Sequence, residues 1–321
     1  MSDPRARGSV VTRQTVEAWR DRRFHRLPQL KVRGERSALR FVDAVGFCFT
    51  LSHFHLPVAS LYVAVCGRRN PRRPKHTHHD PEIILTWNLK NSLPAQRLVY
   101  YGKLVKGKPT LVSLDLLPAF CALIRAGKGS GDYIVDFRHG RMTRAAVLIL
   151  EALHERGPLP TPDLRRVAAM HGAERTAEFD RAMAELQQGL WIAKVEEVYD
   201  PDFYYRWDLL DNWLPDPLAA ARDLSREAAL TRLLSVYLRS AAVAQGSFLA
   251  GLFGVGPAEV AAGLAALEGS GCVRQGLRIN GLAGSWVVWT GEAGQTGRMG
   301  DGRVGEGGRG VSGRTGLEAV P

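Results

Sequence analysis

Histidines gather at two places where a metal site could form. His53 and His55 are two residues apart, a spacing that suits a strand, and residues 76–80 read HTHHD. A zinc site needs three or four such ligands on a rigid frame. The second group follows the run RRNPRRPK, and a flexible loop there would weaken metal binding. We therefore interpret these histidines as polar loop residues, and we expect no metal ion and no cofactor.

Two stretches rich in glycine and lysine suggest phosphate binding but lack the required spacing. Residues 102–108 read GKLVKGK and residues 127–131 read GKGSG. A phosphate-binding loop has Gly, four residues and then Gly-Lys-Ser/Thr, and neither stretch has this pattern. We expect turns at both places. The chain also has no GxSxG or HExxH motif, so the general motifs predict no reaction.

Basic residues exceed acidic ones, with 43 Lys and Arg against 32 Asp and Glu and a formal net charge of +11. The excess lies mainly in the first two-fifths of the chain, between residues 5 and 40, at 68–75 and between 90 and 108. A phosphate backbone attracts such a surface, so we predict double-stranded DNA as the partner. A basic composition without a polyanionic partner is the alternative. The predicted contacts in this region are Arg68, Arg69, Arg72, Arg73, Lys75 and Lys90.

The spacing of the cysteines and the hydropathy pattern indicate in which cellular compartment the protein works. Cys48, Cys66, Cys121 and Cys272 form no CxxC pair, which is typical of reduced thiols rather than of a disulfide framework. No apolar run approaches the roughly 20 residues that cross a bilayer. We expect a cytoplasmic protein, associated with the nucleoid, without a membrane partner.

The elements that would position these residues are clearest over residues 140–215. Apolar residues at helical spacing predict three helices, and alternating residues predict a hairpin. These are helices at 143–153, from Thr161 and at 174–186, and strands at 191–195 and 204–209. Three helices followed by a β-hairpin are typical of a winged-helix domain.

A winged helix usually places its third helix in the major groove of DNA and its hairpin against the backbone. In the middle unit this predicts DNA contacts on the helices. The alternatives are that these residues are solvated faces of amphipathic helices, or that the unit serves protein assembly. The predicted contacts are Arg144, Arg165, Arg166, Arg175, Thr176 and Arg181.

A weaker copy of the same pattern follows over residues 222–290, at a period of about 80 residues, with Ser225 as the cap of its first helix and Pro257 at the start of its third. Residues 10–126 are less regular, and we expect a winged-helix-like domain with a basic loop at 68–80. We expect helices at 13–23, from Ser37 through Phe49 and at 116–126, and strands at 83–87, 98–101 and 110–114. The predicted fold class is α+β, mainly α, with tandem winged-helix domains; a single mixed α domain is the alternative. Residues 291–321 are rich in glycine, and we expect them to be disordered.

Several stretches resemble the bacterial group related to the AlkZ and YcaQ DNA glycosylases, which act on interstrand crosslinks. They span about residues 10–290, which fits the tandem winged-helix organisation. The resemblance implies DNA binding and cleavage of the N-glycosidic bond of a modified base. The stretches are SALRFVDAVGFCF at 37–49, WNLKN at 87–91, LVYYGKL at 98–104, LPTPDLRR at 159–166 and FDRAMAELQ at 179–187.

The resemblance also implies a catalytic position, and this chain departs from it. Glycosylases of the family carry two glutamines, one residue apart, after a glycine that corresponds to Gly46. The glutamine positions fall on Cys48 and Thr50. Neither side chain offers the paired donor and acceptor of an amide. The departure leaves DNA binding intact and argues against the family's glycosylase mechanism.

Three functions remain open from the sequence. The first is a repair enzyme that hydrolyses the N-glycosidic bond with Asp43 or another carboxylate orienting the water. The second is a non-catalytic DNA-binding regulator. The third is a protein-assembly module built from the same helices, which the basic N-terminal region disfavours. Neither the catalytic residues nor the oligomeric state follows from the sequence.

Overall fold

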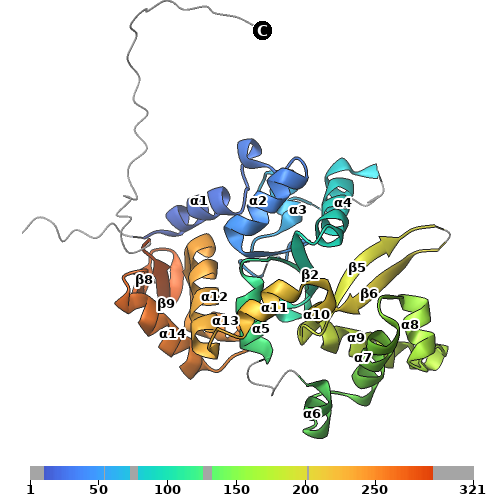
Figure 1. The fold of residues 1–321 in the computed structure, drawn as a ribbon. Helices are drawn as coiled ribbons and strands as arrows, with labels where there is room; N and C mark the ends of the chain where they lie inside the picture. The colour runs from blue at the N-terminus through green and yellow to red at the C-terminus, as the bar shows by residue number, and fades with distance from the viewer. Residues whose placement is uncertain (1–10, 54, 73–78, 126–131, 201, 292–321) are drawn as a thin grey trace, which may run out of the picture.

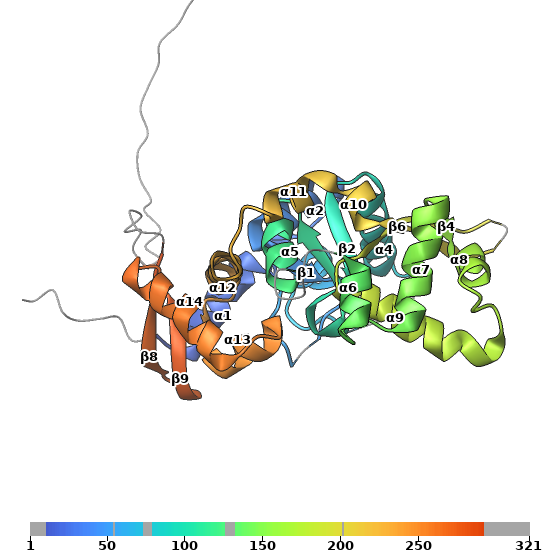
Figure 2. The ribbon, with the colours of Figure 1, turned by 60° about the horizontal axis from the view of Figure 1, so that its bottom comes forward.

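The computed structural model describes residues 11–53, 55–72, 79–125, 132–200 and 202–291. Helices predominate and the strands are short, so the fold is mixed α+β and mainly helical, as the sequence predicts. We call residues 11–125, 132–213 and 214–291 the N-terminal, middle and C-terminal segments. Figures 1 and 2 show the middle and C-terminal segments on opposite sides of the N-terminal sheet.

The N-terminal segment begins with a helix that lies against the C-terminal segment and then forms a small sheet with its own helices. Its elements are α1 (Arg13–Arg23), η1 (Pro28–Leu30), α2 (Glu35–Val45), β1 (Phe47–Phe49), α3 (Leu61–Cys66), α4 (Pro81–Ala95), β2 (Val99–Lys103), η3 (Val105–Gly107), β3 (Pro109–Ser113) and α5 (Leu117–Arg125).

The middle and C-terminal segments have shorter connections. The middle one contains α6 (Tyr133–Arg138), α7 (Arg144–Arg156), β4 (Leu159–Pro160), α8 (Thr161–Val167), η4 (Ala173–Arg175), α9 (Thr176–Gln188), β5 (Ile192–Val198), β6 (Tyr204–Leu209) and α10 (Leu210–Trp213). The C-terminal one contains α11 (Pro215–Ala221), α12 (Arg226–Ala241), β7 (Val243–Ala244), α13 (Gly246–Phe253), α14 (Pro257–Gly269), β8 (Val273–Ile279) and β9 (Leu282–Trp289).

The same order of elements occurs in all three segments: helix, short strand, two helices and a hairpin. Within the described residues the strands form three antiparallel sheets, with orders β1-β3-β2, β4-β6-β5 and β7-β9-β8. In each sheet the short strand pairs with the second strand of the hairpin. The sequence predicted the hairpins of the middle and C-terminal segments but not the short strands, because two or three residues carry no measurable alternation.

Side-chain caps start several helices where the sequence placed them. Thr143 accepts a hydrogen bond from the Ala146 amide at the start of α7, and Ser225 accepts one from the Ala228 amide at the start of α12. Such caps satisfy backbone donors that have no partner within the helix. The predicted starts of these two helices are therefore confirmed.

The N-terminal and C-terminal segments share one hydrophobic core, to which Leu190, Ala193 and Leu210 of the middle segment also contribute, whereas most other buried hydrophobic residues of the middle segment form a second core. Phe47 of β1 is central to the shared core, because its ring contacts those of Phe120, Tyr237 and Phe253 at centroid distances of 5.5–6.3 Å. The core therefore joins residues that lie some 200 positions apart in the sequence. The predicted domain boundaries at 10–126, 140–215 and 222–290 stay a prediction.

Two predictions for the N-terminal segment are wrong. Residues 83–87 were expected to form a strand, but they belong to α4, which Asp80 caps and Pro81 begins. Phe49 was expected to lie on the inner face of a helix, but that helix ends at Val45 and Phe49 lies in β1. Gly46 ends the helix with φ of 76°, a conformation that favours glycine.

In the part of the chain that the structure describes, no single helix is long and apolar enough to cross a membrane. Only the pair α13 and α14, taken together, has the required length and composition, and these two helices are bent by 115° relative to each other.

Candidate nucleic-acid interface

The two positions that the resemblance marks as catalytic, Cys48 and Thr50, lie in β1 and directly after it and are closed to solvent. Cys48 pairs across the sheet with Leu111, which pairs in turn with Tyr101, so the three residues form one row. Cys48 is 0% exposed and Thr50 is 4% exposed. Burial raises the pKa of the Cys48 thiol far above its ordinary value. The thiol therefore stays neutral at physiological pH and is a poor nucleophile.

The Thr50 hydroxyl is hydrogen-bonded to no carboxylate or amide of the described residues. Among the described residues, the Thr50 hydroxyl has no partner within hydrogen-bond distance. Burial raises the pKa of Tyr101, and the nearby Thr50 hydroxyl lowers it. Neither Cys48 nor Thr50 lines any of the three grooves found among the described residues. The motif positions are thus packed rather than arranged to hold water.

Asp43, the carboxylate considered for the water-orienting role, is exposed on α2. Burial raises its pKa somewhat, and the nearby charge of Asp115 raises it further. Asp115 itself accepts a hydrogen bond from Arg232 at 2.8 Å. No contact joins Asp43 to Cys48 or Thr50 among the described residues, so the proposed catalytic role of Asp43 stays a prediction without a contact to support it.

A buried charged cluster, which the sequence did not reveal, joins the β5–β6 hairpin to α4. Lys90 of α4 donates to Glu197 Oε1 of β5 at 2.7 Å, and Lys194 of β5 donates to the same oxygen. Tyr199 donates to Glu197 Oε2 at 2.7 Å and accepts from Asn91 at 2.8 Å. We call these five residues the hairpin cluster.

The charges of the hairpin cluster are strongly coupled. The side chains of Lys194 and Glu197 are both 2% exposed. Burial lowers the pKa of Lys194 to about 8, and the positive charge of Lys90 contributes to the shift. Burial alone would raise the pKa of Glu197, but the two lysines and Tyr199 bring it below its usual value. The Lys194 ammonium also lies 4.4 Å from the ring centroid of Tyr101.

This pKa predicts a pH dependence of stability that Lys194→Met should remove. Because the folded-state pKa is lower than that of an unfolded lysine, the unfolded state binds more protons between about pH 8 and 10.5. The penalty for burying charged Lys194 is therefore full below pH 8 and declines as the pH rises. Urea unfolding gives the free energy of unfolding of K194M minus that of the unaltered protein. We expect this difference to be about 2 kcal/mol lower at pH 9.5 than at pH 7. An equal difference at both values would contradict this assignment.

The far end of the hairpin presents aromatic side chains to solvent. Tyr199 is 63% exposed and Phe203 is 55% exposed, and their rings lie 5.3 Å apart. Tyr205 and Trp207 continue the row along β6 toward the core, with ring contacts at 5.0 and 5.8 Å. Large exposed aromatic groups at a hairpin tip are typical of surfaces that contact a partner.

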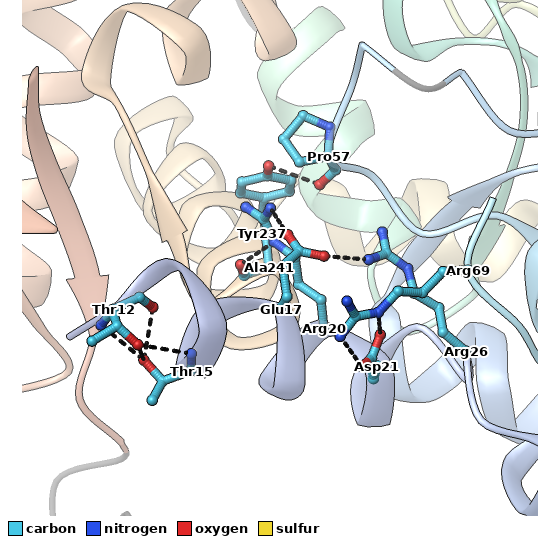
Figure 3. Close-up of polar contacts among 10 residues, drawn as sticks. All are labelled: Thr12, Thr15, Glu17, Arg20, Asp21, Arg26, Pro57, Arg69, Tyr237 and Ala241. Carbon is cyan, nitrogen blue, oxygen red and sulfur yellow. Dashed lines mark hydrogen bonds and ion pairs between the residues drawn. The ribbon is translucent and has the colours of Figure 1, made fainter. Parts of the chain in front are cut away.

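Two predicted DNA contacts in the basic loop are held by acidic residues of the same chain. Arg68 forms a two-pronged ion pair with Glu82 at 2.6 and 2.8 Å. Arg69 forms a similar pair with Asp21 of α1, in a network where Glu17 also binds Arg20 and Arg26 (Figure 3).

The remaining residues of the basic region differ in accessibility. Arg72 is exposed, and its carbonyl accepts a hydrogen bond from Tyr62. Lys90 is largely buried in the hairpin cluster. Arg73 and Lys75 lie outside the described residues, as do residues 76–78 of the histidine run. A role in binding DNA therefore stays a prediction for all of these residues.

The predicted contacts on the middle segment are also largely engaged within it. The Arg144 guanidinium lies 5.9 Å from the Phe137 ring. Arg165 donates to the Thr176 hydroxyl at 2.9 Å. Arg166 pairs with Asp163 and Arg175 pairs with Glu178, each three residues away. These roles likewise stay predictions, and exposed pairs of this kind exchange readily for other partners.

The third helix of the middle segment, α9, is partly covered by the N-terminal segment. The Tyr100 hydroxyl donates to the Gln187 carbonyl at 3.3 Å, and the Lys103 amide donates to the Gln187 side chain at 3.0 Å. The end of α9 therefore lies against β2. Arg181, earlier along α9, remains exposed in a groove beside η3.

The described residues contain no group of three or more His, Cys, Asp or Glu side chains that could hold a metal ion. His53, from the first histidine pair, places its ring edge against Phe49 at a centroid distance of 5.2 Å.

Comparisons with known proteins agree with this architecture. A family model described as AlkZ related matches residues 32–254. Among solved structures, the DNA glycosylase AlkZ of Streptomyces sahachiroi is similar to this chain, with a TM-score of 0.55 and 16% sequence identity over 88% of this chain and 71% of that one. At that identity the likeness concerns the fold. No curated protein sequence matches.

Proposed function

Because this chain belongs to the AlkZ-related family, we propose that it is a DNA-binding protein that does not cleave N-glycosidic bonds at the family's motif positions. Its biological setting would be DNA repair, which the likeness in fold to a DNA glycosylase supports. The activity of that enzyme is not transferred to this chain, because the residues at the motif differ.

The burial of Cys48 and Thr50 is the observation that carries this proposal. Hydrolysis of an N-glycosidic bond needs a group that orients water and stabilises positive charge on the sugar. A target base must also leave the stack and reach that group. A neutral thiol that is 0% exposed and a threonine hydroxyl that is 4% exposed meet neither requirement.

The binding half of the proposal rests on the repeated elements and on charge. We propose that each repeat of helix, strand, two helices and hairpin is a winged-helix domain, a module that commonly docks on DNA. The aromatic tip formed by Tyr199 and Phe203 would lie against the sugar–phosphate backbone or in the minor groove. The exposed arginines on the N-terminal segment include Arg22, Arg33, Arg36, Arg40 and Arg72.

Binding to a plain duplex should depend steeply on salt. With four or more phosphate contacts, we expect the association constant to fall about 100-fold between 50 and 200 mM salt, because each contact releases bound counterions. Fluorescence anisotropy of a labelled duplex measures this directly. An isotherm that does not weaken with salt would remove DNA as the partner and favour the protein-assembly function.

A further inference from the structure

All three segments contribute to one wide groove that is separate from the motif positions. The groove has a volume of about 1070 Å³. Its walls come from η3 of the N-terminal segment, α9 of the middle segment and α13 with the start of α14 of the C-terminal segment. Phe253 and Val255 give it an apolar side. We call it the three-segment groove.

The acidic residues of the three-segment groove are already satisfied. Glu185 accepts hydrogen bonds from the amide and the hydroxyl of Thr143 at 2.9 and 2.7 Å. Glu259 accepts from Arg226 at 2.8 Å and from the Gly256 amide at 2.9 Å. Arg226 is therefore neutralised together with Glu259.

Two cations of the groove are left without such a partner. Lys106 of η3 and Arg181 of α9 are both exposed, and neither forms an ion pair within the described residues. Arg181 is near enough to Glu178 to lower the pKa of that carboxyl, but Glu178 is held by both nitrogens of Arg175. Glu185 binds only the uncharged Thr143 and keeps its negative charge, so the three basic and two acidic side chains of the groove sum to +1. The groove thus combines a net positive charge with an apolar wall.

The backbone conformation of Lys106 and the position of its ammonium place the side chain beside α13 at the groove. Lys106 has φ of 54°, a conformation uncommon for a residue with a side chain. Its ammonium faces α13, where a Cβ built on Gly251 would lie 3.8 Å from the Lys106 Nζ atom. A side chain at position 251 would therefore stand beside the lysine without a clash.

We propose that the three-segment groove binds the sugar–phosphate backbone of one strand of a DNA duplex, with Lys106 and Arg181 on its phosphates. The inference rests on the proposed function and deepens it, because it assigns a path for the DNA. Two free cations attract an anionic chain, and the apolar wall of Phe253 and Val255 suits the deoxyribose. A cationic or neutral peptide would leave both charges unpaired.

The first test removes the two charges. In the double variant Lys106→Ala, Arg181→Ala, we expect the affinity for a duplex to fall roughly tenfold at low salt. The slope of log K against log salt should become shallower by about 1.8, because each phosphate contact contributes about 0.9. The control is Arg138→Ala, Arg222→Ala, which removes the same charge at exposed positions outside both the groove and the three repeats and should leave the slope unchanged.

The second test keeps both cations and changes only position 251. Gly251→Asp places a carboxylate beside Lys106, whereas Gly251→Ala adds the same Cβ without charge. We expect weaker duplex binding in G251D and unaltered binding in G251A. Circular dichroism of each variant checks that the helices remain folded.

The outcomes separate the groove from the proposed function. If the unaltered protein binds the duplex with steep salt dependence but all groove variants bind equally well, the proposed path is wrong and DNA binding stands. If the variants lose affinity only for single-stranded oligonucleotides, the duplex assignment is overturned. Failure of the unaltered protein to bind any DNA would overturn both proposals.

Discussion

Glu197→Ala is expected to lower the free energy of unfolding by about 3–5 kcal/mol, one of the largest effects of any single substitution in this chain. Removing this carboxylate leaves Lys90 and Lys194 buried side by side without a counter-ion. Tyr199 loses its acceptor at the same time. Urea denaturation followed by circular dichroism measures the loss.

The neighbouring residue provides a matched control. Glu196 pairs with Arg206 on the same hairpin, but its side chain is 51% exposed. Exposed ion pairs contribute about 0–1 kcal/mol, so Glu196→Ala should be nearly neutral. Similar losses in both variants would mean that the hairpin cluster does not stabilise the contact between β5 and α4.

Gly46→Ala is expected to destabilise the protein by about 2–5 kcal/mol, mainly through a steric clash. A Cβ at this position would lie 2.4 Å from Val236 Cγ1 and 2.7 Å from Leu116 Cδ2. The positive φ contributes less, because Ala242 holds the corresponding place before β7 with φ of 68°. Thermal and urea unfolding would show the loss.

A second substitution that removes the clashing atom of Val236 provides the control for Gly46→Ala. Adding Val236→Ala to Gly46→Ala removes the nearer of the two clashing atoms, so the double variant should lose less stability than the sum of the single variants. Strict additivity would show that backbone strain at position 46, rather than packing against α12, determines the cost.

Local signals in the sequence account for the helices of the middle and C-terminal segments. Thr143 and Ser225 cap their helices, and Pro257 begins α14, as their positions in the pattern indicated. The hairpin of the middle segment followed from the alternation at 191–195 and 204–209, which overlaps β5 and β6. The mainly helical α+β class could be predicted for this reason.

In the N-terminal segment the strand prediction is wrong where apolar residues cluster. Residues 83–87 are rich in β-branched and aromatic side chains, which favoured a strand. The better signal preceded them, because Asp80, Pro81 and Glu82 form a typical helix start. In α4 the buried positions Ile83, Thr86, Leu89 and Leu93 then follow helical spacing.

The candidate site could be predicted only in part, because charge can be read from the sequence but pairing cannot. Lys90 was predicted to contact DNA, yet it is bonded to Glu197, a residue 107 positions later. Arg69 is bonded to Asp21 in the same way, across 48 positions. Lys106 belonged to a stretch interpreted as a simple turn, and only the fold brings it opposite Arg181.

The central claim is that this chain binds duplex DNA and leaves the bases attached, and one experiment tests both halves. Alkylated and crosslinked duplexes are incubated with excess protein, at a concentration that saturates the anisotropy signal, and abasic sites are then counted after alkaline cleavage. We expect full binding and no abasic sites above the protein-free control, since Cys48 and Thr50 are buried and neutral. Abasic sites that accumulate with time would contradict the account.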